Sequence, residues 1–210
     1  MAPRVDRVFL LSPARASGVR AGWLLRPQAS FELAVRLRAG TANLGELFAF
    51  ASGLYFRGKL AYARAFAQPD ASGEGAWVIA PGRGLLPPQT PFTRAELRAL
   101  AAVPVDAAHG PFREPLLRDA RRLATTLAAS TEVVLLGSIA SPKYLEPLLS
   151  VFGSRLRFPR AFVGRGDMSR GGLMLRCVAS GEELEYLAVE GATRTGARPP
   201  RLPRLGRAAS

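Results

Sequence analysis

Residues 132–152, EVVLLGSIASPKYLEPLLSVF, predict a strand, a tight turn and a helix in succession. The apolar run from Val133 to Leu136 is too short for a helix and is typical of a strand that is covered on both faces. Ser141 is suited to an N-cap and Pro142 to the first helical position, and apolar residues then recur at helical spacing. Because ligands bind at the carboxyl ends of strands in open α/β sheets, residues 137–143 are predicted to form one wall of a site.

Similar patterns on both sides of this stretch predict the rest of the fold. Strands are predicted at residues 4–12, 77–80 and 156–159, followed by an antiparallel hairpin of residues 173–178 and 184–189. Apolar spacing and end signals predict helices at residues 31–38, 44–51, 60–67, 93–102 and 115–128. The expected fold is α/β: a three-layer, open, mostly parallel sheet flanked by helices, with a C-terminal β-hairpin at the sheet edge.

The length and composition predict one domain and a tail. The chain has 210 residues, of which 48% are apolar, and this is enough to bury one full core. Residues 1–191 are therefore expected to form a single α/β domain. Residues 192–210 are rich in proline and arginine, contain no acidic residue and have few apolar side chains, so we expect a disordered basic tail.

Cysteine usage and hydropathy predict a cytoplasmic protein without a cofactor. Cys177 is the single cysteine, so there is no internal disulfide, and no paired Cys/His cluster predicts a metal site. The N-terminal apolar run is interrupted by Asp6 and Arg7 and lacks the length of a signal peptide. No segment approaches the roughly 18 apolar residues that a membrane span requires.

The strongly basic charge predicts a phosphate-bearing partner. The formal net charge is +13, and both the body of the chain and the tail contribute to it. All basic residues except Lys59 and Lys143 are arginine, which is also typical of a bacterial GC-rich genome. Nucleic acids and nucleotides are the expected partners, because neutralisation of phosphate supplies most of the non-specific affinity for nucleic acid.

Residues 52–59, SGLYFRGK, allow two interpretations. In the first, they form a turn between helices in which Tyr55 and Phe56 fill the core. In the second, Arg57 and Lys59 point at an anion near a helix N-terminus, where backbone N–H groups also face outward.

Two further turns combine glycine with charge. Residues 81–88, PGRGLLPP, form either a solvated turn or a loop whose backbone approaches a ligand while Arg83 offers a planar fork of donors. Residues 161–172, AFVGRGDMSRGG, form either a functional loop or a plain approach to the predicted hairpin.

The order of these segments resembles a family of small bacterial and phage proteins of uncharacterised function. The segments that carry the resemblance are GLYFRGK at 53–59, VIAPGRGLL at 78–86, LLGSIASPKY at 135–144 and FVGRG at 162–166. The layout is more distantly similar to the uracil-DNA glycosylase superfamily, whose last strand leads into a loop that contacts DNA. The segments at the comparable place are FPRAFVG at 158–164 and MSR at 168–170.

Two departures from the glycosylase pattern indicate that the reaction is not uracil excision. The histidine that the resemblance implies near Pro159 is missing, and residues 12–15, SPAR, contain no acid or histidine that could activate water. The resemblance therefore implies the fold more strongly than the reaction.

The function predicted from these observations is a nucleobase- or nucleotide-processing enzyme, glycosylase-like, that cleaves or exchanges an N-glycosidic bond. The alternative is a non-catalytic protein that binds nucleic acid or nucleotide through the same cations. Asp167 and Ser138 are the candidate catalytic residues, with Asp167 as general base or as the group that orients water. The candidate ligand- and phosphate-binding residues are Ser12, Arg15, Tyr55, Arg57, Lys59, Gly82, Arg83, Gly84, Gly137, Lys143, Tyr144, Arg165, Ser169 and Arg170.

Overall fold

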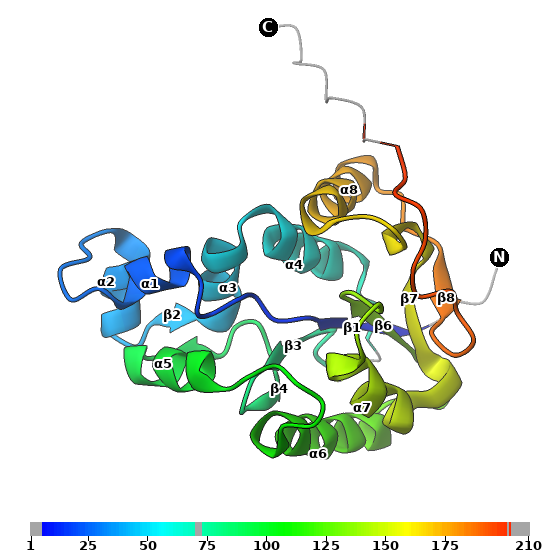
Figure 1. Cartoon of the computed structure of the whole chain (residues 1–210), viewed down its shortest axis with the longest axis horizontal. Helices are drawn as coiled ribbons and strands as arrows, with labels where there is room; N and C mark the ends of the chain where they lie inside the picture. Colours follow the sequence, from blue (N-terminus) through cyan, green and yellow to red (C-terminus); the bar gives the residue numbers. More distant parts are fainter. Residues whose placement is uncertain (1–5, 70–72, 201, 203–210) are drawn as a thin grey trace, which may run out of the picture.

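The computed structural model describes residues 6–69, 73–200 and 202 and has a six-stranded sheet at its centre (Figure 1). The strand order is β4-β3-β1-β6-β7-β8. Strands β3, β1, β6 and β7 are parallel, and the edge strands β4 and β8 pair antiparallel with their neighbours. Their bounds are β1 Arg7–Leu11, β3 Ala76–Ala80, β4 Gly84–Leu86, β6 Glu132–Leu136, β7 Leu156–Pro159 and β8 Tyr186–Ala188.

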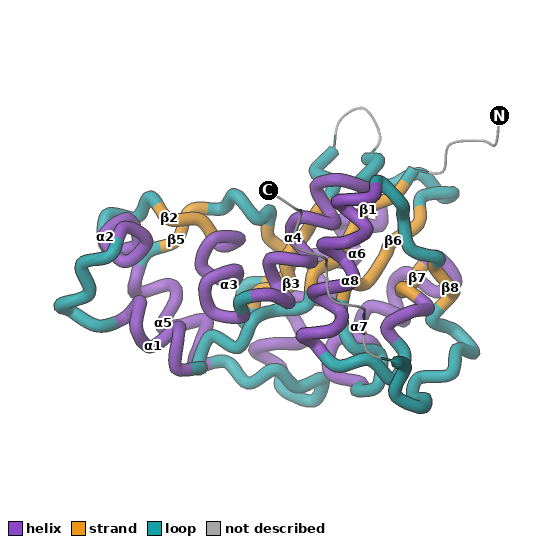
Figure 2. The backbone as a smooth tube through the Cα atoms, turned by 90° about the horizontal axis from the view of Figure 1, so that it is seen from above, coloured by secondary structure: helices purple, strands orange, loops and turns teal. Residues whose placement is uncertain are grey.

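Helices cover both faces of this sheet (Figures 1 and 2). The α-helices are α1 Val19–Leu25, α2 Glu32–Arg38, α3 Leu44–Ser52, α4 Leu54–Phe66, α5 Arg94–Ala102, α6 Gly110–Thr126, α7 Pro142–Phe152 and α8 Asp167–Ser180. Helices α4 and α8 lie on one face, and α6 and α7 lie on the other. The short strands β2 Ala42–Asn43 and β5 Pro91–Phe92 pair at one end of the molecule, near α1, α2 and α5.

Strand β1 shows why the sheet has two apolar faces. Successive side chains of a strand point to opposite faces. Phe9 and Leu11 accordingly belong to the core beneath α4 and α8, whereas Val8 and Leu10 belong to the core beneath α6 and α7. All four side chains are fully buried. The predicted three-layer α/β fold is therefore confirmed, including a central strand that is covered on both faces.

The antiparallel pair at the sheet edge is confirmed, but its predicted composition is wrong. Strand β8 pairs with β7, and residues 173–178 lie within helix α8. The buried residues of α8 are Arg170, Gly171, Met174 and Cys177, which follow helical spacing and not the alternation of a strand. Gly181 then ends the helix in the left-handed conformation, with φ of 71°.

Helix α4 also begins earlier than the sequence predicts. It starts at Leu54, so that Tyr55 and Phe56 occupy its first turn and contribute to the core, as the first interpretation of residues 52–59 predicts. Arg57 is exposed on the same helix, whereas Lys59 is buried.

The predicted tail begins at Ala192 and is only partly described. Its described residues contain no helix or strand, and Gly196 and Ala197 lie against Val163 and Gly164. The segment passes α8 in Figure 1. Residues 201 and 203–210 lie outside the described residues, so disorder of the tail stays a prediction.

Helix α3 begins with a complete capping box, and this gives a first prediction. The Asn43 side chain accepts a hydrogen bond from the Glu46 backbone N–H at 2.9 Å, and the Glu46 carboxylate accepts one from the Asn43 backbone N–H at 3.0 Å. We expect Asn43→Ala to lower the free energy of unfolding by about 1 kcal/mol, measured by urea denaturation. Ser30→Ala, at an exposed position before α2, should change it by less than about 0.5 kcal/mol. Equal effects of the two substitutions would contradict a stabilising cap.

Candidate functional site

A cavity of about 250 Å³ lies at the carboxyl ends of β1 and β6. It is lined by Ser12, Pro13, Ala14, Arg15, Ala51, Ser52, Tyr55, Ser138, Tyr144 and Asp167. Strand β1 pairs with β3 on one side and with β6 on the other. The strand order therefore runs outward from β1 in two opposite directions, which makes this place a topological switch point. Ligands of open α/β proteins bind at such switch points. We refer to this cavity as the Ser12 cavity.

A larger hollow of about 700 Å³ lies beside β4 and α6, but three of its charged side chains, Arg83, Arg118 and Asp119, are already paired. Arg83 forms an ion pair with Glu96 at 3.0 Å. Asp119 accepts a hydrogen bond from the Leu85 backbone N–H at 3.1 Å and is also paired with Arg118 at 2.8 Å. The smaller Ser12 cavity is the better candidate site, because it combines the strand ends with side chains from four separate segments.

Ser12 and Lys59 form a buried polar pair beneath this cavity. Ser12 follows the last residue of β1, and its hydroxyl donates a hydrogen bond to the Leu136 carbonyl at 3.2 Å. The Lys59 ammonium donates to the Ser12 carbonyl at 2.6 Å and to the Ser12 hydroxyl at 2.9 Å. Ser12 is 4% exposed and Lys59 is 1% exposed. Lys59 does not itself line the cavity, but it is hydrogen-bonded to Ser12, which does.

The surroundings of Lys59 favour its neutral form. Burial lowers the pKa of Lys59 to about 7, because the charged amine has lost its hydration. The negative charge of Asp167 raises this pKa and the positive charge of Arg170 lowers it, both to a smaller extent. The amine also lies 4.3 Å from the ring centroid of Tyr55 and 5.0 Å from that of Phe56, and these contacts stabilise its charged form.

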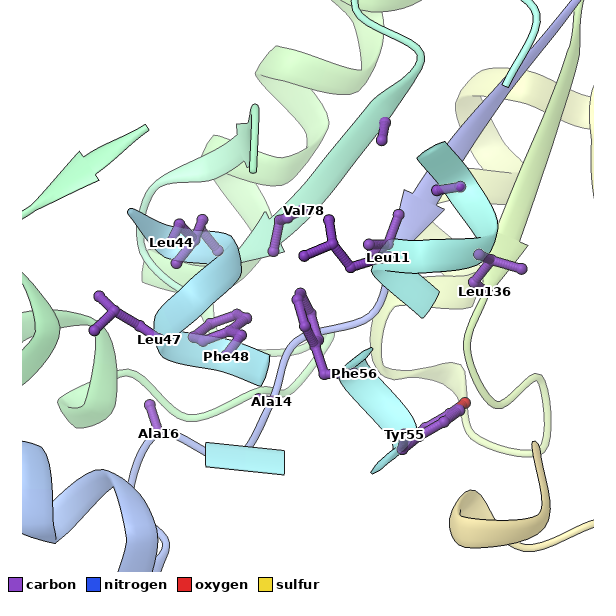
Figure 3. Packing of buried hydrophobic residues seen from close by; sticks show 14 of the residues in the cluster. Leu11, Ala14, Ala16, Leu44, Leu47, Phe48, Tyr55, Phe56, Val78 and Leu136 are labelled. Atoms are coloured by element: carbon purple, nitrogen blue, oxygen red, sulfur yellow. The ribbon is translucent and has the colours of Figure 1, made fainter. Parts of the chain in front are cut away.

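Tyr55 brings a buried hydroxyl to the cavity without a protein partner. The residue is 7% exposed, and among the described residues its hydroxyl has no hydrogen-bond partner. Burial raises the pKa of Tyr55, so the hydroxyl is protonated at neutral pH. Arg170 is near enough to oppose this shift, but its donors are directed at the Phe162 carbonyl and at Asp167. In Figure 3 the hydroxyl points away from the apolar cluster that holds Phe56.

Tyr144 approaches Ser12 from the first turn of α7. Burial raises the pKa of Tyr144, while hydrogen bonds with the Ser12 side chain and the Ser138 backbone lower it to a smaller extent. Gly137 makes this approach possible, because a Cβ atom there would lie 2.9 Å from the Ser12 Cβ and 3.2 Å from the Tyr144 ring. Ser141 caps α7 by accepting a hydrogen bond from the Lys143 backbone N–H. The predicted strand, turn and helix of residues 132–152 are thus confirmed, and they position Ser138 and Tyr144.

Asp167 lines the cavity from the first turn of α8. Its side chain is 67% exposed and forms an ion pair with Arg170 at 3.3 Å. Arg170 is 9% exposed, and its guanidinium donates twice to the Phe162 carbonyl, at 3.2 and 3.0 Å. Arg170 is therefore a structural anchor that holds the 3₁₀ turn Arg160–Phe162 against α8, and it is not directed into the cavity.

The structure brings some of the predicted site residues together and separates others. Ser12, Arg15, Tyr55, Ser138, Tyr144 and Asp167 line one cavity. The candidate residues Arg57 and Lys143 are exposed and do not line it, and Arg83 lines the larger hollow, where it is paired with Glu96. These three cations therefore do not meet Ser138 and Asp167 in one cavity.

The remaining predicted residues have structural contacts elsewhere. Gly82, in the turn before β4, and Gly84, the first residue of β4, have φ of 75° and 81°, and a Cβ at Gly84 would overlap the Asp119 carboxylate. These two glycines therefore permit a turn that packs against α6. Arg165 donates to the Ala161 carbonyl at 3.0 Å and to the Ser169 hydroxyl at 3.1 Å, within the loop that precedes α8 and the start of that helix.

The sequence analysis missed the pairing of Lys59 with Ser12. A signal for it was present, because Lys59 lies four residues after Tyr55 and shares a helical face with it. A lysine on a helix face that is otherwise apolar and aromatic is expected to be buried together with that face. Lys59 is not free to bind phosphate as predicted, because its amine donates to the carbonyl and the hydroxyl of Ser12 at the end of β1.

No protein-family model, curated protein or solved structure matches this chain. The resemblance to the uracil-DNA glycosylase superfamily therefore stays a prediction. Within residues 6–69, 73–200 and 202, no helix is long and apolar enough to cross a membrane. In the same part of the chain, no group of three or more His, Cys, Asp or Glu side chains could hold a metal ion.

Proposed function

We propose that this protein is an enzyme that binds a nucleobase or nucleoside in the Ser12 cavity and cleaves or exchanges its N-glycosidic bond. The observation that carries the proposal is the Tyr55 hydroxyl, which is buried beside the cavity and has no hydrogen-bond partner among the described residues. Leaving a buried hydroxyl unpaired costs about 1–3 kcal/mol, which a ligand with a polar edge would recover. A planar, polar-edged ring meets this requirement.

The size and charge of the cavity favour a single ring system over a polyphosphate. Its volume of about 250 Å³ is below the roughly 300–1,000 Å³ of sites for drug-sized ligands. Among the described residues, Arg15 is the cation that lines it, which suits one anionic group at the rim. The aromatic rings of Tyr55 and Tyr144 and the hydroxyls of Ser12 and Ser138 supply contacts for a base.

Asp167 supplies the carboxylate that N-glycosidic cleavage requires. It lies at the exposed rim, where it can orient or deprotonate a water molecule. A non-catalytic nucleotide- or nucleic-acid-binding role is the second candidate. It is favoured by the ion pair between Asp167 and Arg170, which compensates part of the carboxylate charge.

The test is incubation of the full chain with a panel of purine and pyrimidine nucleosides, with chromatographic detection of free base and calorimetric measurement of binding. We expect Asp167→Asn to lower turnover by about 100-fold while affinity changes less than about threefold. Glu146→Gln, an exposed position on α7 away from the cavity, is the matched control and should behave like the unmodified chain. Binding without turnover would support the second candidate, and failure to bind any of the nucleosides would refute the proposed function.

A further inference from the structure

We propose that Ser12 is a nucleophile and that Lys59 accepts its proton, so that the Ser12 cavity can carry out acyl or phosphoryl transfer. This inference does not rest on the proposed N-glycosidic chemistry. It rests on the pairing of a hydroxyl with an amine at 2.9 Å at the floor of a cavity. A nucleophile and a base within about 2.6–3.2 Å of each other, with the base oriented by a third group, are the geometric signature of an activated nucleophile.

The third group is the backbone of Ser12 itself. Its carbonyl accepts a hydrogen bond from the Lys59 amine at 2.6 Å, which fixes the amine beside the hydroxyl. The rings of Tyr55 and Phe56 enclose the amine on the α4 side. With Lys59 only 1% exposed, its aliphatic stem is also held in place, so the amine has little freedom to leave the hydroxyl.

The direction of the hydrogen bond depends on the protonation of Lys59. When the amine is charged, it donates to the Ser12 hydroxyl, and the hydroxyl donates to the Leu136 carbonyl. When the amine is neutral, its lone pair can accept the hydroxyl proton instead. Burial lowers the pKa of Lys59 to about 7, so that both forms are populated at neutral pH.

The charged and titratable groups around Lys59 come from three helices. Tyr55 of α4 and Tyr144 of α7 are protonated, because burial raises the pKa of each. From α8, the charge of Asp167 favours the ammonium form and the charge of Arg170 opposes it. Neither Asp167 nor Arg170 forms a hydrogen bond with Lys59, so no carboxylate competes with Ser12 for the Lys59 amine.

The reaction step follows from this arrangement. The Ser12 Oγ attacks an electrophilic carbonyl carbon or phosphorus atom, a bond from Oγ to that atom forms, and the hydroxyl proton moves to the Lys59 amine. The leaving group departs with its electron pair and takes the proton back from Lys59. A water molecule then attacks the group held on Oγ and gives a proton to the Lys59 amine, and Oγ leaves with its electron pair and takes that proton, which restores Ser12 and Lys59. The matching substrates are small esters or phosphoesters.

The experiment uses methanesulfonyl fluoride, a small serine-directed electrophile that contains no nucleobase. Oγ replaces fluoride on sulfur, and the covalent product is located by mass spectrometry of the intact chain and its peptides. We expect labelling at Ser12 and a rate that rises with pH through about 7, as Lys59 loses its proton. Ser12→Ala should abolish this label, whereas Ser150→Ala, at an exposed position on α7, should not.

The Lys59→Met variant distinguishes activation of the Ser12 hydroxyl by Lys59 from a merely structural role of Lys59. We expect it to lower the labelling rate by at least about 100-fold and to remove the inflection near pH 7, in a protein whose circular dichroism shows that it is folded. Should Lys59→Met not fold, the pH profile of the unmodified chain still tests the inference, because activation by the neutral amine requires the labelling rate to rise through about pH 7. Absence of labelling at Ser12, or labelling that is independent of pH and of Lys59, would overturn the inference. Either result would leave the nucleoside experiment unaffected.

Discussion

The free energy of unfolding should rise by about 3 kcal/mol between about pH 7 and pH 9.5, and Lys59→Met should abolish this rise. Burial lowers the pKa of Lys59 from 10.5 to about 7. Between these values the unfolded chain binds a proton that the folded chain does not, so stability increases with pH. Each pKa unit corresponds to about 1.4 kcal/mol. The gain is absent below about pH 7, where both states are protonated, and is complete above about pH 10.5.

Urea denaturation at a series of pH values measures this effect, and the chain contains its own control. Lys143 is the other lysine of the sequence and is exposed on α7, so Lys143→Met should keep the full pH dependence. Burial also raises the pKa of Cys177 from 9.0 and that of Tyr62 from 10.0 to about 12, which lowers stability only near and above those pH values. All three proteins share those groups. Parallel curves for the unmodified chain and Lys59→Met would show that Lys59 is not held neutral.

Gly171→Ala should destabilise the protein by about 3 kcal/mol, although alanine normally favours a helix. Helices α4 and α8 cross in backbone contact at Gly58 and Gly171. A Cβ at Gly171 would lie 2.6 Å from the Leu54 carbonyl oxygen, and one at Gly58 would lie 2.7 Å from the Gly171 carbonyl oxygen. Because backbone cannot move aside as a flexible side chain can, the helices must separate, which costs about 1–3 kcal/mol or more.

Gly172→Ala is the matched control for this prediction. Its added Cβ would meet only the Leu202 side chain at 3.7 Å, an ordinary contact. We therefore expect Gly172→Ala to raise the free energy of unfolding by up to about 1 kcal/mol, through helix propensity alone. Thermal and urea denaturation of both variants, with Gly58→Ala as a second test of the crossing, measure the difference. Comparable stabilities of Gly171→Ala and Gly172→Ala would show that the crossing can relax.

The crossing matters for the site because α8 carries Asp167 to the cavity. Gly171 lies one helical turn after Asp167, and Arg170 ties the same turn to the Phe162 carbonyl. If the helices separate, Asp167 moves away from Tyr55 and Ser12. Under conditions where Gly171→Ala remains folded, its reaction with methanesulfonyl fluoride should still occur, because Lys59 lies on α4 and Ser12 directly follows β1, so neither belongs to α8.

Elements with a strong local pattern could be predicted from the sequence. The apolar runs of β1, β3 and β6 are short and continuous, and such runs form strands that are covered on both faces. The predicted helix at residues 93–102 is α5, which begins with a capping box formed by Thr93 and Glu96, and Ser141 caps α7 as predicted. These features depend on neighbours within a few residues, so the sequence contains what is needed.

Residues 173–178 were mispredicted because an isolated apolar run fits either a strand or a helix. The contact with α4 favours the helix, because a helix places Gly171 on the face toward α4 and buries Met174 and Cys177 on that same face. Similarly, glycines and cations suggested a loop at residues 52–59, but the apolar core gained by Tyr55 and Phe56 made this stretch helical.

The sequence by itself determined the α/β class, the strand ends at Ser12 and Gly137, and the turn that places Ser138 and Tyr144 beside them. Only the tertiary structure decided that Lys59 would meet Ser12, which is 47 positions away in the chain, and that Arg57 and Arg83 would not. The reason is that periodicity specifies which face of a helix is buried, whereas the partner of a buried polar group depends on where packing of the backbones places that face. Here the packing of α4 against β1 sets that position.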